Sequence, residues 1–369
     1  MTQQASVELV TADLLEQWQH DAANLLQVLI GVQQAFNHVP AAAIETAAAA
    51  LSLPRAHIEG VIGFYSFLQL QPRGDYDLLF SDNIIEQMLG SRELAERLGQ
   101  RLGIAPGASG GSGRVSLDFT SCTGMGDQGP AALVNGRAVT RLTAQRVDEI
   151  AALIAREQPL SAWPGELFAV DENIRRRDLL LDNPLSQGEA LRAVIERGAQ
   201  QVLDELDDAG LRGRGGAGFR TALKWRLCRE AAADERVVVC NADEGEPGTF
   251  KDRVLLQAYA ESLIEGMTLC AAVIGARRGL LYLRGEYLCL LEGLEQALQR
   301  RREAQLLGDS ILGRQGFDFD IRVHLGAGAY LCGEESALIE SLEGMRGIPR
   351  VRPPFPVTSG YRGRPTVVN

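Results

Sequence analysis

The chain has 369 residues and a formal net charge of −11 at pH 7. This length allows two or three domains with sizeable cores. The excess of acidic residues argues against nucleic acid as a partner, because phosphate backbones are bound by clustered lysine and arginine. No uninterrupted apolar stretch reaches the roughly 20 residues that a membrane span needs, and the first residues lack the pattern of a secretion signal. We therefore expect a cytoplasmic protein without a membrane span.

Residues 1–72 predict a small helical bundle. Apolar residues recur at helical spacing between residues 25 and 70, and Pro40 and Pro54 mark expected helix starts. Residues 73–157 alternate strand, helix, strand, hairpin and helix, which is typical of a thioredoxin-like α/β unit. The Asn135-Gly136 pair inside this segment is a strong signal for a tight hairpin turn.

Residues 158–189 are irregular and interrupted by proline, so we expect them to link the amino-terminal half to a domain at residues 190–369. The tract contains a short basic run at residues 175–181, which we expect to form a solvated linker helix.

The most informative segment is the glycine-rich run from Gly210 to Trp225. Its five glycines remove Cβ atoms where a backbone must approach a ligand, and a helix-forming stretch follows, so the run predicts a phosphate cradle at a helix start. Gly213, Gly215 and Gly218 fit G-x-G-x-x-G, but the residues before them have helical spacing. An ordinary Rossmann fingerprint needs a strand there, so that interpretation is rejected. A glycine-rich surface turn is the alternative.

A β-branched run, residues 237–239, leads into an acidic loop with Asp243, Glu244 and Glu246. Carboxylates repel phosphate, so we expect them to face hydroxyl or amide donors, such as those of a ribityl chain, a ribose or an isoalloxazine edge. A ligand with one anionic end and a polyol middle is well described by FMN. The alternative interpretation of these three acids is a solvated acidic turn.

A third segment repeats this arrangement. Apolar and polar residues alternate over residues 317–325, as in a half-buried strand. Gly326 and Gly328 then turn the chain toward a helix whose start carries Glu334 and Glu335. The two carboxylates indicate a ligand-facing edge, or equally a capped helix start, since acidic residues in a first turn favour the helix dipole.

Four motifs in this order, GRGGAGF, NADEGEPGTFKDR, GAGAYLCGEESAL and RPPFP, resemble the NADH-binding flavoprotein subunit of respiratory complex I. They are equally similar to the diaphorase flavoprotein subunit of NAD-reducing nickel–iron hydrogenases and to related formate dehydrogenases. The resemblance covers about residues 185–369 and implies an FMN-binding, Rossmann-like α/β domain. It also implies an NAD-dependent oxidoreductase that exchanges hydride between NAD(H) and FMN.

The resemblance further implies site residues at matching positions. For FMN these are Gly213, Arg214, Gly215, Gly216, Lys224, Asn241, Asp243, Glu244, Tyr330, Gly333, Glu334, Glu335 and Asn369. For NAD(H) they are Phe219, Glu246, Arg352 and Phe355. Lys224 and Glu335 are the candidates for a catalytic role. The Lys224 ammonium would stabilise negative charge on the flavin, and Glu335 would lie near the hydride path. A surface lysine on a helix is the alternative for Lys224.

The amino-terminal half resembles the two-iron ferredoxin subunit of complex I, placed by fusion ahead of the flavoprotein. This fusion order points to the hydrogenase diaphorase subunit. The family holds its cluster with four cysteines, of which only Cys122 remains here; Ser81, Glu86 and Gly126 stand at the other ligand positions. Because one thiolate cannot hold a two-iron cluster, we expect no metal ligands in this half. The domain would be a structural and docking remnant, with Cys122 a plain buried thiol.

The other five cysteines have no C-x-x-C spacing and are expected to be reduced core residues. They are Cys228, Cys240, Cys270, Cys289 and Cys332. Family members continue beyond the position of Asn369 to a cysteine-rich segment that binds a four-iron cluster. We therefore expect a partial chain or a naturally short version, with the four-iron cluster confined to the segment that is not present.

Three functions are open at this point. The first is a diaphorase module of an NAD-reducing hydrogenase, whose partners would be a small iron–sulfur electron-transfer subunit and hydrogenase subunits. The second is a flavoprotein subunit of complex I or of an NAD-dependent formate dehydrogenase. The third, from a different class, is a non-catalytic assembly subunit or fragment without FMN. A flavin absorbance band in the purified protein would exclude the third.

Overall fold

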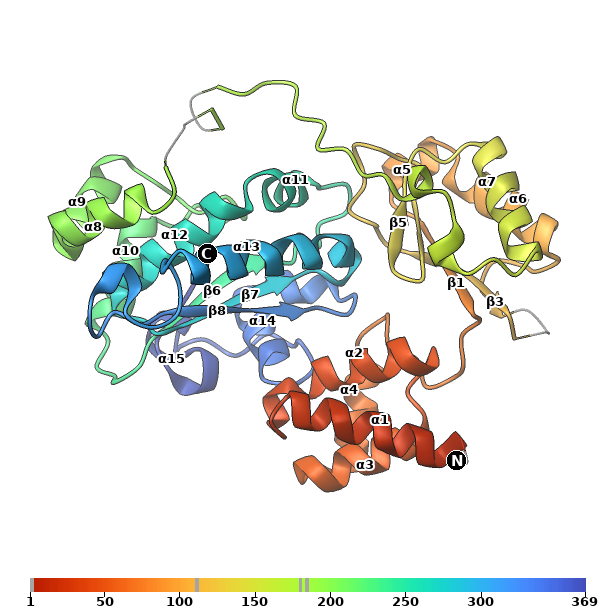
Figure 1. The fold of residues 1–369 in the computed structure, drawn as a ribbon, viewed down its shortest axis with the longest axis horizontal. Helices are drawn as coiled ribbons and strands as arrows, with labels where there is room; N and C mark the ends of the chain where they lie inside the picture. Colours follow the sequence, from red (N-terminus) through yellow and green to blue (C-terminus); the bar gives the residue numbers. More distant parts are fainter. Residues whose placement is uncertain (1–2, 110–112, 179–180, 183–185) are drawn as a thin grey trace.

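The computed structural model describes residues 3–109, 113–178, 181–182 and 186–369. Figure 1 shows amino-terminal helices, a small mixed sheet with its helices, and a larger unit around a parallel sheet. The α/β class expected from the sequence is confirmed. Within the described ranges, no helix is both long and apolar enough to cross a membrane.

The amino-terminal part is a bundle of four α-helices, as the apolar spacing predicts. They are α1 (Gln3–Gln17), α2 (Leu25–Phe36), α3 (Ala41–Leu51) and α4 (Arg55–Ile62), with the 3-10 turn η1 (Ala22–Asn24) between the first two. Pro40 and Pro54 precede α3 and α4 in extended conformation, with ψ of 152° and 138°. Both residues therefore mark the helix starts expected of them.

The second part is built on the five-stranded sheet β2-β3-β1-β4-β5. Its strands are β1 (Tyr76–Ser81), β2 (Ala108–Ser109), β3 (Val115–Thr120), β4 (Ala132–Val134) and β5 (Arg137–Val139). Its helices are α5 (Ile84–Met88), α6 (Ser91–Leu102) and α7 (Ala144–Ala155). β1 and β3 are parallel, while β4 and β5 are antiparallel neighbours. Asn135 and Gly136 turn the chain between β4 and β5 with φ of 47° and 76°, so the hairpin prediction is confirmed.

The linker has less regular structure than the sequence indicated. Two 3-10 turns, η2 (Leu160–Ala162) and η3 (Gly165–Phe168), are followed by irregular chain through residue 178. The helix expected at the basic run is therefore wrong for residues 175–178, and residues 179–180 lie outside the described part. The physical reason for the irregular chain is that Arg177 bonds to residues outside the run. It donates to Tyr259 Oη at 3.1 Å and pairs with Glu172.

The third part contains the sheet β8-β7-β6-β9, in which all neighbours are parallel. Its strands are β6 (Val237–Ala242), β7 (Arg278–Leu283), β8 (Asp320–Leu325) and β9 (Thr366–Val368). Its longer helices are α8 (Glu189–Arg197), α9 (Ala199–Asp208), α10 (Thr221–Glu230), α11 (Lys251–Ala258), α12 (Ala260–Ile274), α13 (Leu291–Glu303) and α14 (Glu335–Leu342). Shorter turns are η4 (Gly285–Leu290), η5 (Ile311–Gly313), η6 (Tyr330–Gly333), α15 (Pro356–Ser359) and η7 (Tyr361–Gly363). Across the sheet, the strands follow the order third, second, first, fourth of their sequence, which matches the first four positions of the Rossmann order 3-2-1-4-5-6.

The two faces of this sheet belong to different cores, because side chains alternate along a strand. Val238 and Leu281 lie in a buried cluster with residues of α12 and α13. The alternate residues, Val239 and Tyr282, lie in a second buried cluster that includes Leu26 of α2 as well as residues of α14. Figure 1 shows α14 and the amino-terminal bundle on the same side of the sheet. The bundle therefore completes the core of the third part.

The cysteines of the described chain are all free. Cys122, Cys228, Cys270 and Cys332 are buried and Cys240 is partly buried, but Cys289 is exposed. The expectation that Cys289 is a core residue is wrong, because it lies in η4, whose buried side is formed by Tyr287 and Leu290.

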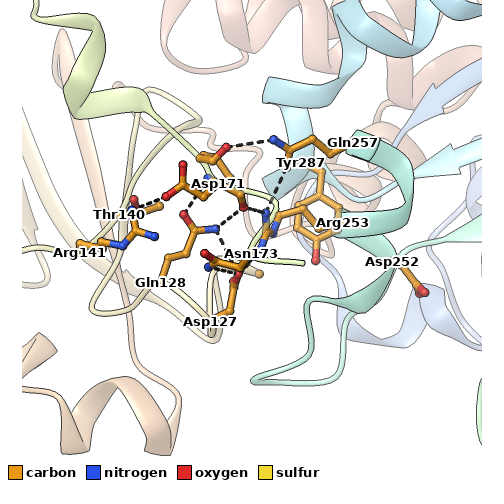
Figure 2. A network of polar contacts seen from close by, with 12 residues as sticks. Asp127, Gln128, Thr140, Arg141, Asp171, Asn173, Asp252, Arg253, Gln257 and Tyr287 are labelled. Carbon is orange, nitrogen blue, oxygen red and sulfur yellow. Dashed lines mark hydrogen bonds and ion pairs between the residues drawn. The ribbon is translucent and has the colours of Figure 1, made fainter. Parts of the chain in front are cut away.

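A buried ion pair joins the second and third parts. Arg253 of α11 is completely buried, and its Nη2 lies 2.7 Å from Asp127 Oδ1. Its Nη1 donates to the backbone oxygen of Asp171 at 2.9 Å, and Gln257 donates to the oxygen of Val170 at 2.9 Å. Figure 2 shows these side chains converging between the thioredoxin-like unit and α11. The linker residues Val170 and Asp171 are thus bonded to α11 at the place where Asp127 of the second part pairs with it.

Asp127→Ala should lower the free energy of unfolding by about 3–5 kcal/mol, because it leaves the Arg253 guanidinium buried and unpaired. The double variant Asp127→Ala/Arg253→Met should recover much of this loss. Glu205→Ala, at the exposed Arg197–Glu205 pair, serves as control and should cost about 0–1 kcal/mol. Urea unfolding measures all four proteins. Equal losses for Asp127→Ala and Glu205→Ala would contradict the assignment.

Candidate functional site

The strand order reverses between β6 and β9, so the carboxyl ends of these two strands form the expected ligand crevice of an open parallel sheet. Asn241 and Asn369 meet there: the Asn241 N–H donates to the Asn369 oxygen at 2.7 Å. With its amide oriented to accept from Trp225 Nε1 at 2.9 Å, the Asn369 side chain also contacts α10. Topology therefore indicates a ligand crevice at this edge of the sheet, where Asn241 and Asn369 lie.

The glycine run forms a narrow loop that leads into α10. Arg212 and Arg220 form an antiparallel bridge, and the Gly213 N–H donates to the Phe219 oxygen at 2.9 Å. Gly215 and Gly216 at its tip are exposed, and an added Cβ on either would meet nothing within 4 Å. The φ of Gly216, +112°, is a conformation that favours glycine. The loop therefore offers open backbone beside the crevice. α9 precedes it, which confirms that this is no ordinary Rossmann fingerprint.

Four charged side chains meet at the mouth of the crevice. Lys224 Nζ donates to the Val368 oxygen at 2.8 Å and lies 3.7 Å from Glu335 Oε2. Arg352 Nη1 lies 3.4 Å from Glu335 Oε1, and its Nη2 lies 3.4 Å from Glu334 Oε1. Lys224 therefore points inward to β9 and α14, and the alternative of a plain surface lysine is excluded.

Asp243 follows β6 and is 4% exposed. Its Oδ2 has no hydrogen-bond partner. Burial raises the pKa of Asp243 to about 8, and the nearby Glu286 carboxylate raises it further while Arg284 opposes. A Cβ on Gly245 would lie 3.0 Å from Oδ2 and one on Gly333 3.5 Å, so glycines leave the oxygen accessible on those sides. Near neutral pH the group is largely a carboxylic acid that can donate a hydrogen bond.

Asp243 also lines a cavity of about 40 Å³ together with Arg284, Glu286 and Tyr330. This volume accommodates about one or two water molecules.

Two of the predicted acidic residues cap the amino-terminal ends of helices. The Glu244 carboxylate accepts from the N–H groups of Asp252 at 2.8 Å and Arg253 at 3.1 Å, at the beginning of α11. The Glu334 carboxylate accepts from the N–H groups of Ser336 and Ala337 at 2.9 Å each, at the beginning of α14. The helix-cap interpretation thus holds for Glu334. Both carboxylates are fixed before any ligand binds.

Three aromatic residues surround these charges and are unusually exposed. Phe219 is 45%, Phe355 52% and Tyr330 59% exposed. Lys224 Nζ lies 5.9 Å from the centre of the Phe219 ring, and the Arg352 guanidinium lies 5.9 Å from that of Phe355. The Tyr330 hydroxyl donates to Glu246 Oε2 at 2.7 Å. Exposed rings beside cations are suited to stacking on a planar ligand.

Arg284 and Tyr287 were missed by the sequence analysis. Arg284 is 3% exposed and donates to the backbone oxygens of Glu244 and Cys122, both at 2.7 Å. The Tyr287 hydroxyl donates to Glu244 Oε2 at 2.7 Å. A signal was available: Arg284 directly follows β7, just as Asp243 follows β6, and such positions meet at one edge of a parallel sheet.

The positions at which the resemblance places cluster ligands, Ser81, Glu86 and Cys122, also lie together. The Asn83 amide occupies the space between them, donating to Ser81 Oγ at 3.0 Å, Glu86 Oε1 at 3.3 Å and Cys122 Sγ at 3.5 Å. Glu86 is fully buried and its Oε2 accepts from the Ala131 N–H at 2.7 Å. Burial raises the pKa of the Glu86 carboxyl, while this N–H and the Ser81 and Asn83 side chains oppose the rise.

The fourth ligand position has no space for a side chain. A Cβ at Gly126 would lie 2.9 Å from the backbone oxygen of Gly248. Among the residues that the structure describes, no group of three or more His, Cys, Asp and Glu side chains could hold a metal ion.

Comparisons with known proteins find relatives for both the amino-terminal half and the parallel-sheet domain of the chain. Residues 206–369 match the family model of the Nuo51 FMN-binding domain, and residues 11–155 match that of the thioredoxin-like [2Fe-2S] ferredoxin. The alpha subunit of the NAD-reducing hydrogenase HoxS of Cupriavidus necator is 42% identical over an aligned length of 368 residues, and the match covers 96% of this chain and 61% of the relative. The chain is a close homologue of that alpha subunit. It spans about three-fifths of the relative's length.

Two further comparisons differ in how much of the chain they match. An NADH-quinone oxidoreductase subunit of Escherichia coli is 50% identical over 181 residues, which are 49% of this chain and 40% of the relative. A crystal structure of NAD+-reducing [NiFe]-hydrogenase in the H2-reduced state has a TM-score of 0.88 at 45% identity and covers 95% of this chain and 59% of that chain. The similarity to the hydrogenase therefore extends over both halves.

Asp243→Asn should stabilise the chain at high pH relative to wild type. The raised pKa of Asp243, about 8 against an ordinary 3.8, means that the folded state binds a proton which the unfolded state releases. The stability that this proton binding contributes is present below pH 4 and is lost as the pH rises through 8. The free energy of unfolding of Asp243→Asn minus that of wild type should therefore rise by about 1.4 kcal/mol or more between about pH 5 and about pH 9. A difference independent of pH in urea unfolding would refute the raised pKa.

Proposed function

We propose that the chain is a diaphorase module that exchanges hydride between NAD(H) and FMN and exchanges electrons with iron–sulfur partners of an NAD-reducing hydrogenase. The observation that carries this proposal is the joint position of the open glycine loop, the Lys224–Glu335–Arg352 charges and the exposed rings at the carboxyl ends of β6 and β9. When bound, FMN supplies the chemistry of accepting hydride and releasing electrons singly.

The residues fit FMN in two respects. The loop at Gly215 and Gly216 leaves space that a Cβ would fill, and its backbone and Arg214 would hold the phosphate. The buried, unpartnered Oδ2 of Asp243 would donate to a hydroxyl or ring acceptor. The remaining FMN contacts that we propose are Gly213, Lys224, Asn241, Glu244, Tyr330, Gly333, Glu334, Glu335 and Asn369.

For NAD(H) we propose that Phe219 and Phe355 flank the base and the nicotinamide, and that Glu246 accepts from a ribose hydroxyl. Arg352 would pair with the pyrophosphate. Lys224 would stabilise negative charge at the flavin ring, and Glu335 would hold both Lys224 and Arg352 in place through its two oxygens. These side chains bind and orient, since hydride transfer between two cofactors requires no protein nucleophile.

The proposed partners are a small iron–sulfur electron-transfer subunit and hydrogenase subunits, and the proposed location is the cytoplasm. The HoxS alpha relative matches 96% of this chain, whereas the Escherichia coli relative matches 49%. This coverage favours the hydrogenase type over a complex I type, because the thioredoxin-like half is part of the match. A four-iron cluster would belong to sequence beyond this chain.

Titration of the purified chain with FMN, followed by NADH, tests the proposal. Wild type should bind FMN, and the visible flavin band should bleach on addition of NADH. Gly215→Ala should raise the dissociation constant for FMN about tenfold, equal to about 1.4 kcal/mol, because a methyl group would enter the phosphate cradle without disturbing the fold. Gly293→Ala is the matched control, since its added Cβ also meets nothing within 4 Å, in α13 away from the loop.

A colourless wild-type chain that takes up no FMN would overturn the diaphorase proposal and favour the assembly subunit. Equal FMN affinities for Gly215→Ala and Gly293→Ala would move the phosphate site away from the loop.

We also propose that the thioredoxin-like half binds no two-iron cluster. Anaerobic reconstitution of the wild-type chain with iron and sulfide should give no two-iron spectrum, because Ser81, Glu86 and Gly126 supply no thiolate and Asn83 fills the space. Ser81→Cys/Glu86→Cys should remain without a cluster, since a third thiolate still leaves Gly126 blocked by Gly248. Stoichiometric iron with a two-iron absorption spectrum in wild type would disprove this proposal.

A further inference from the structure

The loop at residues 122–127, where the resemblance to the two-iron ferredoxin places two ligand positions, lies directly against the loop at residues 244–248. Cys122 Sγ accepts from the Gly248 N–H at 3.4 Å, and from the Gly124 N–H at 3.3 Å within its own loop. Cys122 is completely buried. The thiol is thus a hydrogen-bond acceptor for the backbone of the other unit, which a plain buried thiol is not.

Arg284 joins the same two loops through their backbones. Its Nη2 donates to the Cys122 oxygen and its Nη1 to the Glu244 oxygen, both at 2.7 Å. The Glu286 carboxylate, 2.9 Å from its Nε, compensates the buried charge. One guanidinium therefore fixes the distance between the two loops.

Close packing adds to these bonds. A Cβ on Gly126 would lie 2.9 Å from the Gly248 oxygen, and one on Gly124 would lie 2.2 Å from the Tyr287 ring. Tyr287 in turn donates to the Glu244 carboxylate. A side chain at position 126 would therefore clash with the loop at residues 244–248, and one at position 124 would clash with Tyr287.

The far ends of both loops are fixed as well. Asp127 ends the first loop and pairs with Arg253, whose own N–H donates to the Glu244 carboxylate at 3.1 Å. Figure 2 shows Asp127 and Arg253 in this network, with Tyr287 beside them. The loop at residues 244–248 is thus held from the thioredoxin-like unit at both of its ends.

We propose that the degenerate ligand loop, residues 122–127, positions the nucleotide-binding loop at residues 244–248, and that Cys122 and Arg284 are the positioning residues. The inference rests on the proposed function in one respect, that Glu244 and Glu246 face FMN and NAD(H). Neither Cys122 nor Arg284 takes part in chemistry.

Hydrogen exchange of the chain without added cofactor tests the positioning directly. In Cys122→Ala, backbone exchange in peptides covering residues 244–253 should rise about fivefold, because the Gly248 amide at the end of the loop loses its hydrogen-bond acceptor. Arg284→Lys should have the same local effect, since an ammonium cannot reach both oxygens. Peptides from α13 should be unchanged in both variants. Cys270→Ala, which removes another buried thiol, in α12, is the matched control and should leave residues 244–253 unchanged.

Kinetics of the FMN-loaded chain give the second measurement. Cys122→Ala should raise KM for NADH about fivefold with kcat nearly unchanged, because the loop binds the nucleotide and does not react. Unchanged exchange at residues 244–253 in both Cys122→Ala and Arg284→Lys would overturn the inference, whether or not FMN binds. If exchange at residues 244–253 rises in the two variants but the wild-type chain takes up no FMN, the positioning is upheld and only the diaphorase function is rejected.

Discussion

A parallel sheet must be covered on both faces, and this requirement governs the whole molecule. In β6 and β7, Val238 and Leu281 are covered by helices of the same unit, whereas Val239 and Tyr282 share a core with the amino-terminal bundle. Removal of the bundle would expose the part of the second face that it covers together with α14. The amino-terminal half therefore has a structural role that is independent of electron transfer.

The same half also sets the loops at the carboxyl ends of the strands. The Ser66 and Phe67 N–H groups donate to the oxygens of Gly328 and Ala327 at 3.1 and 3.0 Å, next to Tyr330. Gln27 of α2 pairs with both the N–H and the oxygen of Leu325, in place of a neighbouring strand. Loops after parallel strands have few bonds of their own, so their conformation depends on what packs against them. Here the loop at residues 244–248 is held by Cys122, and the loop at residues 327–328 is held by Ser66 and Phe67.

Local signals in the sequence were sufficient for most elements and for the motif residues. Pro40, Pro54 and the Asn135-Gly136 turn act through their own backbone preferences, so their neighbours matter little. Long-range contacts could not be derived in this way. Asn83 gains its role only because β1 and β3 bring Ser81 and Cys122 together, and Arg284 only because two distant loops meet around it. The basic run at residues 175–178 was mistaken for a helix for the same reason, since the bond from Arg177 to Tyr259 depends on a distant residue.

The acidic character of the site raises the question of how it could accept a phosphate-bearing ligand. Asp243 is largely neutral at pH 7 because burial raises its pKa to about 8. Glu244 and Glu334 face the positive ends of α11 and α14 and bond to their first N–H groups. Glu335 lies between Lys224 and Arg352. Most of the formal negative charge is thus compensated within the protein, so these carboxylates repel an anion at the glycine loop only weakly. Glu335 at the same time holds Lys224 and Arg352, the two cations that would bind an anionic ligand.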